Sequence, residues 1–301
     1  MKSRKKANGI ARHRAMVGRL FVLPFTLGFI LLFLVPTLQS LQYSFSKVSF
    51  ENGLFEVSWL GIDNYVFAFT KDAQFPQMLA NTFKNMALQV PIILLFSMFI
   101  AVILNQQFRG RNIARAVFFL PVIVTSGIII SILNEDIFNQ AMRVGNEQSS
   151  TIFQSTGLQQ MMISLKIPTG VISTLTGMVN KIFDMLWRSG VQILIFLAAM
   201  QSVPGHLYEA ARIEGATGWE SFWKITFPMI SPMMFTCLIY TIIDTFIDYS
   251  NEIMLSIHQM AFTQLRYAYA CTMAWVFFVL MSLVILVVYL VVGKRVFYAV
   301  D

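Results

Sequence analysis

Long apolar runs alternate with polar segments along the whole chain. Six of the runs carry no charged residue: Leu20–Gln39, Met86–Leu104, Ala116–Leu133, Ser189–Val203, Met229–Ile243 and Tyr267–Gly293. An α-helix needs about 20 residues to cross a hydrocarbon core of about 30 Å, and the fourth and fifth runs reach that length only with their flanking residues. The pattern predicts an all-α, polytopic membrane protein with six transmembrane helices.

The composition supports a membrane protein, with 56% hydrophobic and only 12% charged residues. A soluble domain of this length would be far more polar. The net charge of +7 does not indicate a nucleic-acid partner, because seven basic residues lie in Lys2–Arg19, directly before the first run. There we expect contact with anionic lipid. The first run is too long for a signal peptide, contains Pro24 and Pro36, and lacks a small-x-small cleavage site, so we expect it to remain a span.

The distribution of Lys and Arg predicts the orientation. Four segments hold 14 of the 22 basic residues: 1–19, 105–115, 205–226 and 294–301. Basic residues concentrate in short cytoplasmic segments, so we expect these four to be cytoplasmic. Residues 1–19 are then a cytoplasmic basic N-terminus, 20–301 form the transmembrane domain, and both termini are inside.

A short polar segment between the fourth and fifth runs has the features of a docking element. Pro204 and Gly205 are expected to end the preceding helix, and a new helix should begin near Leu207. Glu209 is then expected in its first turn, where the helix dipole favours a carboxylate. Ala210 and Ala211 offer a shallow surface to another protein, and Gly215 permits a sharp turn.

Aromatic residues follow this turn at roughly helical spacing: Trp219, Phe222, Trp223 and Phe227. They predict a helix at the membrane surface that leads into a span beginning at Pro228. An interfacial helix that only anchors a loop is the alternative, but it explains neither the small residues beside Glu209 nor the glycine turn.

This segment resembles the signature loop of permease subunits of binding-protein-dependent ABC importers. The match runs from about Trp187 through Pro232, and Glu214 stands where the family usually has Asp. The resemblance is to the carbohydrate-uptake type, which includes maltose, glycerol-phosphate and multiple-sugar permeases, and it implies a type I importer permease fold. It further implies that loop 205–227 inserts into a groove of a separate ATPase, with six coupling residues: Glu209, Ala210, Ala211, Glu214, Gly215 and Ala216.

The resemblance also implies the partners. They are a second homologous permease subunit, a cytoplasmic ATPase dimer that binds ATP and Mg, and an extracellular or periplasmic substrate-binding protein, all at a prokaryotic cell membrane. The sequence itself has no G-x-x-x-x-G-K-[ST] phosphate loop and no nucleophile signature. The three histidines are scattered, and Cys237 and Cys271 are expected to be free thiols. We therefore expect a transport subunit that is not an enzyme and holds no cofactor or metal.

Two outer segments, about 46–83 and 135–184, are longer than minimal loops. The second contains Leu158–Leu165 and Val171–Leu186, which have the pattern of short amphipathic helices. Packing against the helical bundle and a platform for the binding protein both remain open for these segments.

Charged and polar side chains within the spans indicate a path for cargo, because charge in hydrocarbon usually faces a cavity. Arg188 and Gln192 share one helix face, as do Asp244 and Asp248. Arg188 and Asp244 each lie sixteen residues from Pro204 and Pro228 respectively, which is roughly 24 Å along a helix. Arg188 and Asp244 are therefore expected at the same depth in the membrane, where they form an ion pair or contact the cargo.

The resemblance to sugar permeases points to Ser189, Gln192 and Asp244 as the positions that contact sugar in the family, although the side chains here differ. Trp187 and Tyr240 offer faces for stacking on a sugar ring, with core or interfacial packing as the alternative. The candidate path comprises Trp187, Arg188, Ser189, Gln192, Tyr240, Asp244 and Asp248.

The function expected from these observations is import of an oligosaccharide or related carbohydrate. Another solute, such as an amino acid, a peptide or a polyol phosphate, is the first alternative. A secondary transporter is the second, but the chain shows no internal repeat of the kind such carriers have.

Overall fold

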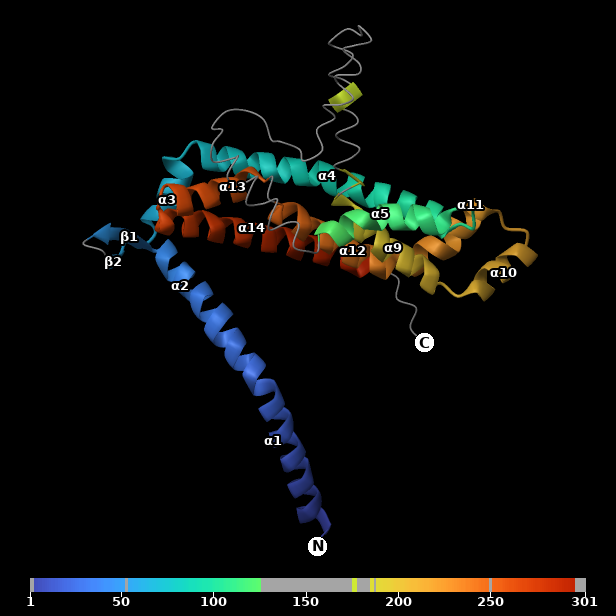
Figure 1. The fold of residues 1–301 in the computed structure, drawn as a ribbon, viewed down its shortest axis with the longest axis horizontal. Helices are drawn as coiled ribbons and strands as arrows, with labels where there is room; N and C mark the ends of the chain where they lie inside the picture. Colours follow the sequence, from blue (N-terminus) through green and yellow to red (C-terminus); the bar gives the residue numbers. More distant parts are fainter. Residues whose placement is uncertain are drawn as a thin grey trace. The chain divides into compact units, whose positions relative to one another are not determined.

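A computed structural model describes residues 3–51, 54–125, 175–177, 185–186, 188–248 and 251–295. Helices dominate these ranges (Figure 1). The N-terminal elements are α1 (Ser3–Phe29), the π-helix η1 (Ile30–Leu34), α2 (Val35–Ser44), β1 (Ser46–Glu51), β2 (Leu54–Trp59), α3 (Asp63–Thr70), α4 (Gln74–Asn105) and α5 (Arg111–Thr125). The C-terminal elements are α9 (Gly190–Ser202), α10 (Gly205–Ile213), α11 (Gly218–Ser221), the π-helix η2 (Phe222–Thr226), α12 (Phe227–Ile247), α13 (Glu252–His258), the π-helix η3 (Gln259–Thr263), α14 (Tyr267–Val292) and the 3₁₀-helix η4 (Gly293–Arg295).

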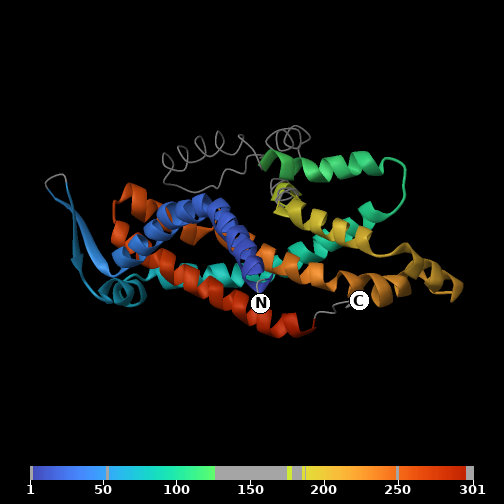
Figure 2. The ribbon, with the colours of Figure 1, turned by 90° about the horizontal axis from the view of Figure 1, so that it is seen from below.

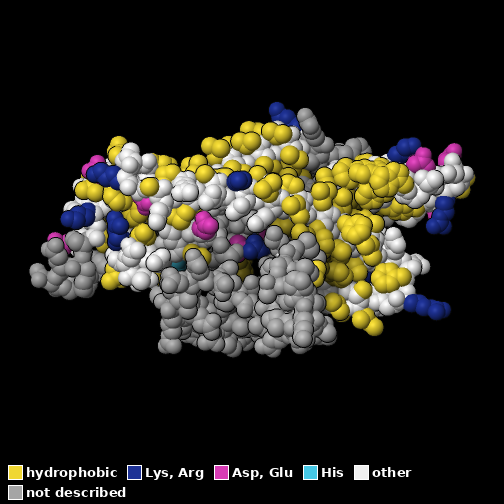
Figure 3. All heavy atoms as spheres, turned by 90° about the horizontal axis from the view of Figure 1, so that it is seen from above, with side chains coloured by type: hydrophobic (Ala, Val, Ile, Leu, Met, Phe, Trp, Pro, Cys, Tyr) yellow, Lys and Arg dark blue, Asp and Glu magenta, His cyan; other side chains and the backbone are white. Residues whose placement is uncertain are grey.

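Four continuous helical segments of the described residues are long and apolar enough to cross a membrane: His13–Ser44, Gln74–Asn105, Gly218–Ile247 and Tyr267–Val292. The bent pair α9 and α10 adds a fifth if it is counted as one span. The third predicted run, Ala116–Leu133, is described only as far as Thr125, at the end of α5. Apolar side chains form broad areas of the described surface, as expected for helices that face lipid (Figure 3).

Two of the π-helical turns have a common cause in the sequence. The five residues of η1 precede Pro36, and the five residues of η2 precede Pro228. In each case proline is the second residue of the α-helix that follows. A proline ring clashes with the carbonyl four residues earlier and supplies no N–H, so the preceding turn widens.

Segment 46–83, predicted as an outer loop, differs from the all-α expectation, because it begins with an antiparallel hairpin of β1 and β2. The register pairs Ser46 with Trp59 and Glu51 with Leu54. Two residues, Asn52 and Gly53, separate the strands, and Asn-Gly is the dipeptide typical of a two-residue hairpin loop. The fold is therefore mostly helical rather than all-α. The predicted loop also ends early, since α4 already begins at Gln74.

The chain groups into two compact units: Met1–Ala80 with Glu252–Leu280, and Asn81–Asn251 with Met281–Asp301. In the first unit, the end of α2 is held by hydrogen bonds from two other elements. Asn64 Nδ2 and Thr272 Oγ1 each donate to the Ser44 carbonyl, at 3.1 Å in both cases. The Tyr65 hydroxyl lies 2.8 Å from Ser44 Oγ. These contacts fix α3 and the start of α14 against the end of α2.

Asp72 caps the N-terminus of α4 in the same unit. Its Oδ1 accepts hydrogen bonds from the backbone N–H groups of Gln74 and Phe75, at 2.9 and 3.2 Å. The Tyr269 hydroxyl donates to its Oδ2, and the Arg266 guanidinium lies over the Tyr269 ring. Burial raises the pKa of Asp72, but these hydrogen bonds and the Arg266 charge outweigh burial, so the net pKa is below its ordinary value.

The core of the second unit lies where α4, α5, α9, η2 and α12 meet. Its fully buried members include Ala101, Ile193, Phe196 and Cys237. Arg115 of α5 donates from Nε and Nη2 to the Leu104 carbonyl at the end of α4, at 3.2 and 2.9 Å. A cation at a helix C-terminus satisfies carbonyls that have no partner within the helix. Cys237 and Cys271 are free thiols, as expected.

Candidate functional site

The polar segment between α9 and α12 folds as a helix–turn–helix. Helix α9 ends at Ser202, Val203 and Pro204 are extended, and α10 begins at Gly205. The axes of α9 and α10 differ by 63°. Figures 1 and 2 show α10 and α11 extending past the ends of α9 and α12. We call residues 205–227 the coupling segment.

Helix α10 has two distinct faces. Leu207 and Tyr208 pack against the core of the second unit. The opposite side is exposed and contains Glu209, Ala210 and Ile213, the last with 86% of its surface accessible. The expectation that Glu209 lies in the first turn is wrong: α10 begins at Gly205, so Glu209 is its fifth residue. The helix dipole, which stabilises carboxylates in the first turn, therefore does not stabilise the Glu209 carboxylate.

Gly215 makes the turn that follows α10. Its φ is +76°, a left-handed conformation that glycine adopts without steric cost. Its N–H donates to the Arg212 carbonyl at 3.1 Å, and the Ala216 N–H donates to the Ala211 carbonyl at 2.9 Å. These two bonds define a Schellman motif, which satisfies the last carbonyls of the helix. The predicted glycine turn is confirmed.

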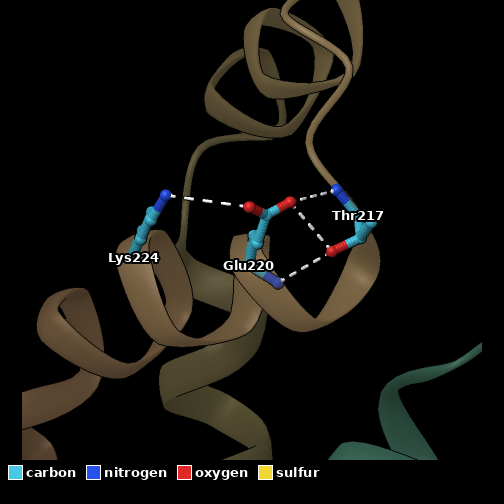
Figure 4. Close-up of polar contacts among 3 residues, drawn as sticks. All are labelled: Thr217, Glu220 and Lys224. Atoms are coloured by element: carbon cyan, nitrogen blue, oxygen red, sulfur yellow. Dashed lines mark hydrogen bonds and ion pairs between the residues drawn. The ribbon is translucent and has the colours of Figure 1, made fainter.

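A capping box starts α11 (Figure 4). Thr217 Oγ1 accepts from the Glu220 N–H at 3.3 Å, and Glu220 Oε2 accepts from the Thr217 N–H at 2.9 Å. Lys224 Nζ lies 3.9 Å from Glu220 Oε1, and both side chains are largely exposed, so this ion pair contributes little. The spacing Thr-x-x-Glu is a known sequence signal for a helix start, which the sequence analysis missed.

The predicted aromatic residues form a ladder from α11 into α12. The ring of Trp223 lies 5.6 Å from that of Trp219 and 5.1 Å from that of Phe227, between ring centroids. Trp219 is 72% exposed and Trp223 is 44% exposed. Exposed indole rings next to an apolar helix are typical of a membrane interface.

The second cluster of candidate residues lies between α9 and α12. Arg188 Nη1 is 2.6 Å from Asp248 Oδ2, and both side chains are partly buried. Of the two alternatives for Arg188 and Asp244, the ion pair is not formed: Arg188 pairs with Asp248 instead, although it also interacts electrostatically with Asp244. Asp248 directly follows the last residue of α12 and lies one helical turn beyond Asp244, so Arg188 reaches the carboxylate at the end of the helix rather than the one within it.

Gln192 is fully buried, with 0% of its surface accessible. Its amide adjoins the Asp244 carboxylate, yet neither Nε2 nor Oε1 has a hydrogen-bond partner in the described part of the chain. Leaving a buried amide unpaired costs roughly 1–3 kcal/mol. Asp244 itself is exposed and forms no salt bridge within the described residues.

The other candidate residues differ in whether their side chains are free to contact cargo. Ser189 is buried, and its hydroxyl donates to the Met185 carbonyl, so it is already used within the helix. Tyr240 is half-buried and lies one turn before Asp244 on α12. Trp187 lies outside the described residues, as does most of the 135–184 segment, including Leu158–Leu165. The cluster that the structure does bring together is Arg188, Gln192, Asp244 and Asp248.

Three functional candidates were missed at the level of sequence: Ile213, Tyr208 and Thr226. Ile213 is the most exposed large apolar side chain of α10. The Tyr208 hydroxyl lies 2.8 Å from Thr226 Oγ1. The spacing of Leu207, Tyr208 and Ala211 has the helical period of an inward face and was a usable signal for Tyr208.

The fold and these two clusters define a class: a helical membrane protein with a polar cluster between two spans and an exposed helix–turn–helix suited to docking. Residues 74–298 match the family of binding-protein-dependent transport system inner membrane components. The chain belongs to this family. It is the permease component of an ABC importer, and its place is in a bacterial inner membrane.

Named relatives are similar over most of their length. The probable ABC transporter permease YesP of Bacillus subtilis (strain 168) is 31% identical over 303 residues, which cover 95% of this chain and 93% of YesP. The multiple sugar-binding transport system permease MsmF of Streptococcus mutans is 26% identical and covers 85% of this chain and 88% of its own length. The arabinooligosaccharides permease AraP of Bacillus subtilis is 31% identical and covers 75% of this chain and 68% of its own length.

A solved structure has the same fold. A chain of a bacterial ABC transporter that imports the acidic polysaccharide alginate matches with a TM-score of 0.63, at 18% identity, over 96% of this chain and 99% of that chain. The family consists of transport subunits without a catalytic centre or cofactor, and ATP is handled by a partner. A secondary transporter, the more distant alternative, does not agree with this family.

Proposed function

We propose that the chain carries an oligosaccharide or related carbohydrate from an external binding protein into the cytoplasm. The observation that supports this cargo is the set of relatives named for multiple sugars and arabinooligosaccharides, which align over most of this chain. Cargo of another kind, such as an amino acid, a peptide or a polyol phosphate, is the alternative that must be tested.

The charge of the polar cluster favours some of these cargo classes over others. Arg188, Asp244 and Asp248 provide one positive and two negative side chains. A net negative cluster disfavours a phosphorylated cargo and favours a neutral or basic one. Gln192 adds an amide that has two donors and an acceptor for hydroxyl groups. In this proposal Trp187 and Tyr240 supply stacking faces, and Ser189 shapes the path through its backbone contact.

The coupling segment is the proposed contact with the ATPase dimer, which binds ATP and Mg. The exposed face of α10 presents Glu209, Ala210 and Ile213, and the turn at Glu214–Ala216 projects beside it. Small residues allow close approach, and the isoleucine supplies an apolar anchor of the kind that interface centres use.

The proposed topology has six spans, with residues 1–19 and both termini in the cytoplasm. The sixth crossing requires the run Ala116–Leu133 to continue beyond α5, and α9 to cross with the residues that precede it. The bond from the Ser189 N–H to the Met185 carbonyl supports helical extension of α9 in that direction. Six spans form half of the transporter, so a second homologous permease completes the path.

Uptake into proteoliposomes tests the cargo. The chain is reconstituted with its partner permease, ATPase and binding protein, and ATP-dependent uptake is measured for oligosaccharides, amino acids, peptides and polyol phosphates. We expect uptake of a saccharide only. Uptake of a phosphorylated polyol or of an amino acid in its place would overturn the carbohydrate assignment.

Purification of the complex tests the docking face separately. The ATPase should copurify with the wild-type chain and with Ala80→Ser, a variant outside the coupling segment, but only weakly with Glu209→Lys, because the substitution reverses a charge on the exposed face. Equal ATPase recovery with all three chains would exclude this face as the docking site.

A further inference from the structure

A short chain of hydrogen bonds ties α10 to the base of α12. The Tyr208 hydroxyl lies 2.8 Å from Thr226 Oγ1, and Thr226 Oγ1 lies 3.5 Å from the Ser221 carbonyl. A threonine hydroxyl has one proton to donate. If that proton goes to the Ser221 carbonyl, the Tyr208 O–H must be the donor to Thr226. The order is then Tyr208 to Thr226 to the last residue of α11.

The π-helix in which Thr226 lies explains why its hydroxyl can donate to a carbonyl five residues earlier. The wider turn of η2 brings the Thr226 hydroxyl next to the carbonyl of Ser221, which lies five residues earlier in the chain. Thr226 is 7% exposed, so the link is shielded from water. A hydrogen bond away from water is not readily replaced by solvent when one partner is removed.

The link closes a loop around the Gly215 turn. Tyr208 precedes the turn and Thr226 follows it, eighteen residues later. Between them the Schellman motif at Gly215 and the capping box of Thr217 hold both flanking helix ends. Each junction of the coupling segment is thus held by a named hydrogen bond, so the segment is suited to move as one piece.

Packing gives the loop a direct connection to the span. Leu207 and Tyr208 of α10 contact the same core cluster as Ile225 of η2 and Met229 at the start of α12. Packed interiors transmit displacement because they resist compression. Apolar contacts alone, however, permit sliding, whereas a hydrogen bond keeps one register.

We propose that Tyr208 and Thr226 are positioning residues that couple movement of α10 to α12. This proposal rests on the docking of α10 to the ATPase stated above. When the ATPase displaces α10, the link makes the base of α12 follow, and α12 carries Asp244 in the polar cluster. Neither residue needs to touch the ATPase or the cargo.

The test measures cargo imported per ATP hydrolysed by the complete transporter in proteoliposomes. We expect Tyr208→Phe and Thr226→Val each to lower this ratio about five-fold, which corresponds to the loss of one hydrogen bond of ordinary net strength. The double variant should be no worse than either single variant, because both remove the same bond. Thr226→Ser keeps the hydroxyl and should keep the ratio.

Tyr289→Phe is the matched control, since Tyr289 is an exposed tyrosine of α14 outside the coupling segment. It should leave the ratio unchanged. A residue with only a structural role would reduce the yield of assembled complex and not the ratio, so yield is measured in parallel. An unchanged ratio in both single variants, or additive losses in the double variant, would overturn the proposal.

Failure of the docking assignment gives a different result. If α10 does not dock to the ATPase, the Glu209→Lys chain would still copurify with the ATPase, regardless of the import ratio measured for the Tyr208 variants. If docking holds, Tyr208→Phe should retain the ATPase fully and lose only coupling, whereas loss of the ATPase from Tyr208→Phe would also contradict the positioning role.

Discussion

At the scale of residues, a cluster of polar and charged groups beside two apolar helices distinguishes this chain from an inert apolar bundle. The Arg188–Asp248 pair, the unpaired amide of Gln192 and the carboxylate of Asp244 gather between α9 and α12. Charged groups within a membrane protein face one another or a polar path. The pair satisfies two of these charges, and Asp244 and Gln192 are the proposed contacts for water or cargo in the assembled transporter.

The Arg188–Asp248 pair should be needed for stability. Asp248→Asn leaves a partly buried guanidinium without its carboxylate, so we expect a loss of about 1–3 kcal/mol, between the values for exposed and fully buried pairs. Thermal unfolding of the purified complex measures it. The exchange Arg188→Asp with Asp248→Arg should recover part of the loss, and Asp244→Asn is the control that should leave the unfolding temperature nearly unchanged. A larger effect from Asp244→Asn would reverse the assignment of the pair.

Asp72 should make one end of the first unit sensitive to acid. Because its pKa is lowered on folding, its contribution to stability is present above the unfolded pKa and is lost as pH falls through the folded pKa, below about 4. Asp72→Asn retains a capping side chain but has no charge for Arg266 and does not titrate. The unfolding temperature of the variant should therefore fall less than that of the wild type between pH 5 and roughly pH 3. If the unfolding temperatures of the wild type and the variant fell by the same amount over this pH range, Asp72 would not be the source of the acid sensitivity.

At the scale of elements, the coupling segment combines ordinary capping devices into one stiff unit. The Schellman motif ends α10, the capping box begins α11, and η2 leads into α12. Signals for all three are present in the sequence as a glycine, a Thr-x-x-Glu and a proline. The glycine turn and the helix start at Pro228 were predicted from sequence, while the capping box and the π-turn were overlooked.

Gly215 and Gly218 form a matched pair for testing the turn. A Cβ at either position would meet no atom within 4 Å, but only Gly215 has a positive φ, of +76°. Gly215→Ala should therefore cost about 1–2 kcal/mol through backbone conformation alone, whereas Gly218→Ala should cost far less. ATPase recovery and stimulated hydrolysis should fall for Gly215→Ala and stay normal for Gly218→Ala. Equal behaviour of the two variants would mean that the left-handed turn is not required.

At the scale of the whole molecule, the proposed orientation puts the coupling segment on the cytoplasmic side of the membrane, where ATP is available. The basic segments 1–19, 105–115 and 205–226 all support this side.

Cysteine labelling from each side tests the orientation. In a background without Cys237 and Cys271, single cysteines at Asn8, Asn112 and Gly218 should react only from the cytoplasm, and those at Gln148 and Ile62 only from outside. Ile62 is a better external site than Asn64, because Ile62 is 64% exposed while the Asn64 amide is hydrogen-bonded to the Ser44 and Ser46 carbonyls. Reaction of any one position from the opposite side would require a different number of spans.

The sequence by itself determined the membrane class, the place of four spans and the helix–turn–helix within residues 205–227. These depend on local properties: apolar runs of helical length, glycine at a turn, and a motif of contiguous residues. The run Tyr267–Gly293, for example, corresponds to α14 within one residue.

Only the tertiary structure decided which polar groups meet. Arg188 pairs with Asp248, at the end of α12, rather than with Asp244, one turn earlier on that helix. Tyr208 reaches Thr226 because a turn and a π-helix bring together residues that are eighteen positions apart. Such contacts depend on where helices end and how they pack, and side-chain spacing along an ideal helix does not contain that information.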